Sequence, residues 1–156
     1  MDILTIGLGT IGTTYSYLFN KAGHNVEHYI RKSSKKINIT ELNVDMLDGR
    51  NNKKGEHYTD TYKVNTHTKD NYDFIFISMP AGNIESVIET LNSNNIKGTI
   101  ILCCGIWEDK KYLEKIMQGR EYILGYPVAG GNIVDATLTC CVFDHFILEK
   151  KENSKI

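Results

Sequence analysis

Residues 3–12, ILTIGLGTIG, constrain the fold more than any other stretch, because an apolar, β-branched run leads directly into the pattern G-x-G-x-x-G. A helical pattern follows at once, which is the strand–turn–helix context of a dinucleotide-binding fingerprint. We expect Gly7 to allow the tight turn and Gly9 to let a pyrophosphate approach the backbone. Gly12 should let the helix pack close to the strand. The alternative is a glycine-rich turn in another α/β domain.

In this interpretation the first helical turn presents its free N–H groups and the positive end of its dipole to the phosphates. The predicted cofactor contacts in this stretch are Gly7, Leu8, Gly9, Thr10, Ile11 and Gly12.

The end of the second predicted strand indicates which dinucleotide binds. NAD-binding domains usually carry an Asp or Glu there, but residues 30–36 read IRKSSKK and contain no acid. Arg31 and Lys32 are placed to meet a 2′-phosphate, and Ser33 is placed to donate a further hydrogen bond. The sequence therefore favours NADP(H) over NAD, with a solvated basic loop as the alternative.

The remaining pattern predicts an α/β, Rossmann-like, doubly wound and mostly parallel sheet in a single domain over residues 1–148. Residues 149–156 form a polar tail, or the start of a linker to a helical substrate domain. The predicted strands lie at residues 26–30, 72–78, 99–103 and 121–124, and the helices at 10–22, after Asn83 and at 109–118. Residues 37–70 predict a β-excursion that includes strands at 37–39 and 42–46, residues 125–132 a glycine-rich loop, and residues 137–148 one or two further strands.

Ligands of such sheets bind beyond the carboxyl ends of the strands. Three loops should therefore converge on the site, at residues 7–12, 79–83 and 104–107, and the loop at 125–132 should border it.

Composition excludes several other classes of protein. The 156 residues carry a net charge of −1, which gives no field to attract nucleic acid. No apolar stretch is long enough for a transmembrane helix, and the first residues do not resemble a signal peptide, so we expect a cytoplasmic protein. The four cysteines form two adjacent pairs in apolar runs, which is typical of reduced, buried thiols. No metal site is expected, because no His or Cys cluster has ligand spacing.

The sequence resembles the N-terminal NADP-binding domain of the ketopantoate reductase (2-dehydropantoate 2-reductase) family. The resemblance rests on residues 7–12, 23–26 and 72–78, on Arg31, and on residues 125–131, which read GYPVAGG. It implies that NADPH lies on residues 7–12 with its 2′-phosphate on Arg31. It also implies contacts from the loop around Met79 and Pro80 and from the turn at Cys104 and Gly105.

The chain departs from the family pattern at two positions. Pro80 stands where the family commonly has a Lys, and Cys104 where it commonly has an Asn. The resemblance also implies that the catalytic Lys and a substrate-binding acid belong to a helical C-terminal domain that residues 1–156 do not include. Catalytic residues therefore remain unassigned, because Tyr126 and Cys104, though close to the predicted site, are more typical of structural residues.

Two functions follow from these features. The first is the NADP(H)-binding domain of a ketopantoate-reductase-like oxidoreductase, with hydride transfer from NADPH to a 2-keto acid such as 2-dehydropantoate. The alternative is a stand-alone NADP(H)-binding module without turnover; a domain for another nucleotide ligand, such as FAD, is less favoured by Arg31 and Lys32. A helical substrate domain and a second copy of the chain are the partners compatible with the sequence.

Overall fold

The structure is a computed structural model that describes residues 1–103 and 109–151. The strands are β1 (Asp2–Ile6), β2 (Asn25–Tyr29), β3 (Glu41–Asp48), β4 (Glu56–Lys63), β5 (Asn71–Ile77), β6 (Lys97–Leu102), β7 (Tyr122–Tyr126), β8 (Ala129–Val134), β9 (Thr137–Val142) and β10 (Ile147–Leu148). The helices are α1 (Thr10–Lys21), α2 (Ile84–Ser93) and α3 (Lys110–Met117), with a short 3-10 turn η1 (Ala81–Asn83) before α2.

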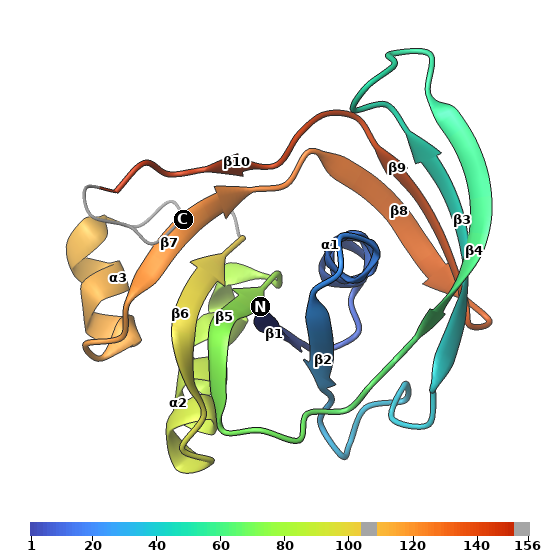
Figure 1. Ribbon diagram of the computed structural model, residues 1–156. Coiled ribbons are helices and arrows are strands. Elements are labelled where there is room, and N and C mark those ends of the chain that lie inside the picture. The colour runs from blue at the N-terminus through green and yellow to red at the C-terminus, as the bar shows by residue number, and fades with distance from the viewer. Residues whose placement is uncertain (104–108, 152–156) are drawn as a thin grey trace.

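The first sheet has six strands in the order β10-β7-β6-β5-β1-β2, and all of its pairings are parallel except that of β10 with β7. Helix α1 covers one face of this sheet, while α2 and α3 cover the other (Figure 1). The predicted doubly wound, mostly parallel α/β fold is therefore confirmed.

A second sheet, in the order β4-β3-β9-β8, packs against the side of α1 that faces away from the first sheet (Figure 1). It combines the 37–70 excursion with residues from the end of the chain, because β3 pairs in parallel with β9. The sequence predicts the strand at residues 42–46 but not this partner. The predicted strand at residues 37–39 is wrong, since that segment is a turn that precedes β3.

The predicted glycine-rich loop at residues 125–132 is also wrong, because β7 and β8 occupy most of it. These glycines allow close packing of β7 and β8 against neighbouring segments. A Cβ on Gly125 would lie 2.5 Å from the ring of Phe146, and one on Gly131 would lie 2.2 Å from the carbonyl oxygen of Thr139. Glycine inside a strand marks such close approaches as well as loops, and the pattern alone does not separate the two.

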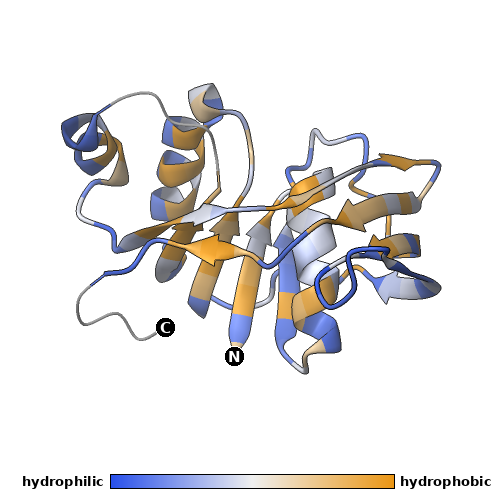
Figure 2. Cartoon of the chain, turned by 90° about the horizontal axis from the view of Figure 1, so that it is seen from above, coloured by the Kyte–Doolittle hydropathy of each residue, from blue (hydrophilic) through white to orange (hydrophobic). Residues whose placement is uncertain are grey.

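Alternating side chains of the first sheet supply two separate cores. In β5, Ile75 and Ile77 pack with α2 and α3, whereas Phe76 packs with α1 and the second sheet. Figure 2 shows the hydrophobic residues concentrated along the strands, with hydrophilic residues on the turns and at the strand ends. The buried thiols of Cys103 and Cys140 belong to the core on the α1 side.

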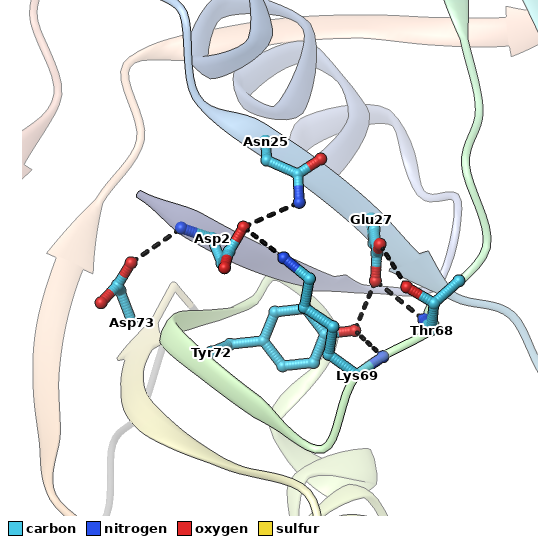
Figure 3. A network of polar contacts seen from close by, with 7 residues as sticks. All are labelled: Asp2, Asn25, Glu27, Thr68, Lys69, Tyr72 and Asp73. Atoms are coloured by element: carbon cyan, nitrogen blue, oxygen red, sulfur yellow. Dashed lines mark hydrogen bonds and ion pairs between the residues drawn. The ribbon is translucent and has the colours of Figure 1, made fainter.

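The amino edge of the first sheet is closed by a network of polar contacts (Figure 3). Glu27 of β2 is buried and accepts hydrogen bonds from Tyr72 Oη at 2.6 Å and from the backbone N–H and hydroxyl of Thr68 at 2.8 and 2.7 Å. Asp2 accepts from Asn25 and pairs with Lys69 Nζ at 2.7 Å. Although burial by itself would raise the pKa of Glu27, the hydrogen bonds from Tyr72 and Thr68 hold that pKa below its ordinary value.

In the part of the chain that the structure describes, no helix is both long and apolar enough to cross a membrane.

Candidate functional site

The turn between β1 and α1 has the geometry that the sequence predicts. Gly7 has φ +81°, a left-handed conformation that favours glycine, and its N–H donates to Tyr29 O at 2.8 Å. Gly9 is the N-cap of α1 with extended backbone, and no side chain caps the first turn. The N–H groups at the start of α1 therefore lack side-chain acceptors from the described residues, and this helix end attracts an anion.

Each of the three fingerprint positions requires glycine for a different physical reason. Gly7 is required by its positive φ. A Cβ on Gly12 would lie 3.2 Å from Thr5 Cγ2, so that glycine is required by the packing of α1 on β1. Gly9 has an ordinary φ of −81°, and a Cβ there would meet only Ser78 O, at 4.0 Å. Neither backbone strain nor internal packing explains glycine at position 9, so the remaining reason is access from outside.

A fully buried histidine supports the turn from β2. His28 Nδ1 lies 2.9 Å from Gly7 O, and His28 Nε2 lies 2.8 Å from the hydroxyl of Tyr62 in β4. Because a carbonyl oxygen only accepts, Nδ1 carries the proton, and Nε2 accepts from Tyr62. Burial lowers the pKa of His28, although the bond to Gly7 O opposes this, so the imidazole is neutral. The second sheet thus helps to hold the glycine turn.

A cavity of about 460 Å³ opens at the carboxyl edge of β1 and β2, beside this turn. Its walls come from the glycine turn, the end of β2 with the following loop, and α2 with the segment before it. Its lining residues are Ile6, Gly7, Leu8, Gly9, Tyr29, Ile30, Arg31, Ser33, Ser34, Lys35, Lys36, Met79, Asn83, Ser86, Val87, Thr90 and Leu91. This lining includes three cations and no carboxylate, so the cavity favours an anionic ligand with an apolar part.

The structure brings together about half of the residues predicted from the sequence. Gly7, Leu8, Gly9, Arg31, Ser33 and Met79 line the cavity. Thr10, Ile11 and Gly12 form the first turn of α1 directly behind it, while Lys32 and Pro80 are outside the lining. Cys104 and Gly105 lie outside the described residues. Tyr126 ends β7 with its side chain half exposed.

Lys36 lines the cavity but is not among the site residues predicted from the sequence. Its Nζ donates to Leu8 O at 2.8 Å, which ties the basic loop to the glycine turn. Lys36 belongs to the same IRKSSKK run that predicts a phosphate site. The run is bent by hydrogen bonds that include the one from Ser34 N to Arg31 O, and in this conformation Arg31, Lys35 and Lys36 line the cavity while Lys32 does not.

A larger hollow of about 1000 Å³ lies at the opposite, amino edge of the sheet, where Met1, Lys97 and Glu121 line it. Ligands of parallel α/β sheets bind at the carboxyl edge, where the strands point and the following helices begin. The smaller cavity has the glycine turn and the uncompensated cations, and we therefore take it as the functional site.

The chain is similar to known proteins in sequence and in fold. A family model described as "Ketopantoate reductase PanE/ApbA" matches residues 3–132, which is most of the chain. No protein of curated function matches the sequence significantly.

Among solved structures, a PanE/ApbA family ketopantoate reductase from Ralstonia eutropha JMP134 superposes with a TM-score of 0.71 at 14% identity, over 97% of this chain and 50% of its own. A 2-dehydropantoate 2-reductase from Methylococcus capsulatus gives 0.63 at 17% identity, over 95% and 47%. A D-mandelate dehydrogenase solved with NADH and anilino(oxo)acetate gives 0.63 at 14% identity, over 95% and 47%. The TM-scores show a shared fold, and the chain spans about half the length of these structures.

Proposed function

The chain belongs to the ketopantoate reductase family, and we propose that it is the NADP(H)-binding part of an oxidoreductase of this family. The reaction class is hydride transfer from NADPH to a 2-keto acid such as 2-dehydropantoate. The nicotinamide supplies the hydride when the cofactor is bound, and the residues described above bind and orient that cofactor.

The observation that carries the proposal is the unexplained glycine at position 9. Gly9 lines the cavity and is the N-cap residue of α1, a helix whose first turn has no side-chain cap. Neither its φ nor the packing around it requires a glycine. A phosphate group that approaches the backbone at this point explains why a side chain is absent. The uncompensated cations in the same cavity add the attraction that an anionic ligand requires.

Arg31 supports a preference for the 2′-phosphorylated cofactor. It follows β2 directly, its side chain is exposed, and it lines the cavity together with Ser33. The guanidinium presents paired N–H donors that match a phosphate group, and no carboxylate in this lining competes for them. An acid at this position would instead bind the 2′-hydroxyl of NAD.

Binding is tested by titrating the purified chain with NADPH and with NADH and following the nicotinamide fluorescence. We expect tighter binding of NADPH. Equal or tighter binding of NADH would contradict the assignment to NADP(H), and binding of neither would contradict the function itself.

The variant Gly9→Ser separates ligand access from folding. Serine is a good N-cap, so the thermal midpoint of the apo-protein should stay the same or rise. Affinity for both dinucleotides should fall at least tenfold, because the side chain occupies the space and the N–H groups that the ligand needs. Gly12→Ala gives the opposite pattern for stability: its Cβ would lie 3.2 Å from Thr5 Cγ2, so this variant should lower the thermal midpoint. Unchanged affinity in Gly9→Ser would contradict the argument.

The second candidate is a binding module without turnover, because the residues that line the cavity are suited to bind and orient a dinucleotide. It is tested by following NADPH absorbance with ketopantoate added to the 156 residues alone. We expect no oxidation above the blank. Sustained turnover would demonstrate a proton donor and a substrate site within this chain, and would favour the oxidoreductase activity without a second domain.

A further inference from the structure

We propose that Lys36 is a second phosphate-binding residue, whose ammonium group contacts the pyrophosphate of the dinucleotide from across the glycine turn. This inference rests on the proposed NADP(H)-binding function and adds a residue that neither the fingerprint nor the position after β2 predicts. It assigns the two phosphate-bearing parts of the cofactor to two different cations, Lys36 and Arg31.

The first support is the place of the ammonium group. Lys36 Nζ lies 2.8 Å from Leu8 O, the carbonyl between the two glycines of the turn, and the side chain is half-buried along the cavity wall. The loop that carries it is folded back by the bonds from Ser34 N to Arg31 O and from Lys36 N to Ser34 Oγ. The charge is therefore held at the turn before any ligand arrives.

The second support is the lack of a compensating charge. The ion pairs of the described residues engage Lys21, Arg50, Lys69 and Lys110, together with His57 and His145, and none of them involves Lys36. An ammonium group has three donors, and within the described part of the chain only Leu8 O accepts from it. A half-buried cation with two unused donors and no carboxylate in its cavity is a binding group for an anion.

The third support is which anion Lys36 can reach. Lys36 Nζ is held at the glycine turn by its hydrogen bond to Leu8 O. In this type of fold, the N–H groups at the start of the helix that follows the turn face the pyrophosphate. Arg31 instead follows the end of β2, where the adenosine ribose lies. The pyrophosphate is common to NADPH and NADH, so loss of Lys36 should weaken both ligands equally. Loss of Arg31 should weaken NADPH selectively.

The experiment compares Lys36→Gln, Lys36→Arg, Lys32→Gln and Lys53→Gln by titration with NADPH and with NADH. Gln removes the charge but keeps an N–H donor, whereas Arg keeps the charge. We expect Lys36→Gln to weaken both ligands by about tenfold with no change in the thermal midpoint, and Lys36→Arg to stay within about threefold of the wild type. Lys53 lies exposed at the tip between β3 and β4, so Lys53→Gln controls for net charge and should leave both affinities unchanged.

A second readout is ionic strength. The NADH affinity of Lys36→Gln should fall less steeply with added NaCl than that of the wild type, because one attractive charge is missing. A purely structural role for Lys36 would leave this slope unchanged.

Four outcomes overturn the proposal while leaving the proposed function intact. In the first three, Lys36→Gln binds both ligands like the wild type, loses affinity for NADPH only, or loses thermal stability together with affinity. In the fourth, Lys32→Gln weakens binding more than Lys36→Gln does. If the wild-type chain binds neither dinucleotide, the proposed function and this inference both fail.

Discussion

The two edges of the first sheet differ in whether their charged side chains have partners within the protein. At the amino edge, the carboxylates of Asp2 and Glu27 are matched by Lys69, Tyr72 and their neighbours (Figure 3). At the carboxyl edge, Arg31, Lys35 and Lys36 follow β2 and line a cavity that contains no carboxylate. The strands are the same, and the difference lies in whether the protein supplies the partner of each charge.

This contrast separates stability from binding. A charged group whose hydrogen-bond partners all belong to the protein stabilises the folded state, so its removal lowers the free energy of unfolding. A cation without a protein partner adds little to folding and keeps its donors for a ligand. Substitutions at the amino edge should therefore change the free energy of unfolding, and those at the carboxyl edge should change affinity.

The largest effect should come from Arg31→Ala at the carboxyl edge. We expect NADPH affinity to fall by about 50-fold, because a charge-assisted pair of hydrogen bonds is lost, while NADH affinity changes by less than about threefold. The thermal midpoint of the apo-protein should not move, since Arg31 is exposed and enters no ion pair with the described residues. Parallel titrations and a thermal scan measure all three. An equal loss for both cofactors would show that Arg31 supports the turn rather than the 2′-phosphate.

The next largest effect should come from Tyr72→Phe at the amino edge. The hydroxyl of Tyr72 donates to Glu27 at 2.6 Å, and its removal leaves a buried carboxylate with one donor fewer. We expect a loss of about 2 kcal/mol in the free energy of unfolding, measured by urea denaturation, with unchanged cofactor affinity. A change in affinity without a change in stability would reverse the contrast between the two edges.

The sequence predicts the glycine turn and the first sheet because both depend on short-range signals. The turn needs only the spacing of Gly7, Gly9 and Gly12, and buried parallel strands such as β5 appear as continuous apolar runs. The second sheet escapes prediction because β3 pairs with β9, whose residues lie far along the chain. Alternation identifies a strand but does not identify its partner.

The cavity could be predicted only in part, for a similar reason. The basic composition of residues 31–36 predicts an anion site, but only the folded loop shows that Lys35 and Lys36 line the cavity and that Lys32 is outside the lining. His28 gives no sequence signal at all. It lies within a strand, and only the fold brings Tyr62 of the second sheet to its other nitrogen.

A smaller effect should follow from His28, which lies buried between the second sheet and the glycine turn. Burial lowers the pKa of His28 in the folded protein. Below about pH 6.5, this imidazole therefore binds a proton in the unfolded chain but stays neutral in the folded protein. The free energy of unfolding should therefore fall as the pH drops from 6.5, by at most about 1.4 kcal/mol per pH unit from this group.

His28→Asn is the matching control, because it keeps a donor for Gly7 O and removes the titrating ring. Denaturation curves at pH 7.5 and pH 5.5 should show a smaller difference for the variant than for the wild type. The other histidines are present in both proteins and cancel in the comparison. Equal pH dependence would mean that the folded protein accommodates a charged His28, and that the link between the second sheet and the turn is loose.

The smallest effect should come from Lys69→Met, which removes the ion pair with Asp2 at the amino edge. Both side chains of this pair are well exposed, so water and salt screen the attraction that lowers the pKa of Asp2. The free energy of unfolding should change by less than half of the change in Tyr72→Phe, and the difference should vanish in about 0.5 M NaCl. A larger, salt-resistant loss would show that the ammonium group of Lys69, and not only its backbone N–H, stabilises the buried Glu27 network. The stability of the amino edge would then depend on the exposed ion pair of Lys69 with Asp2 as well as on the buried hydrogen bonds of Glu27.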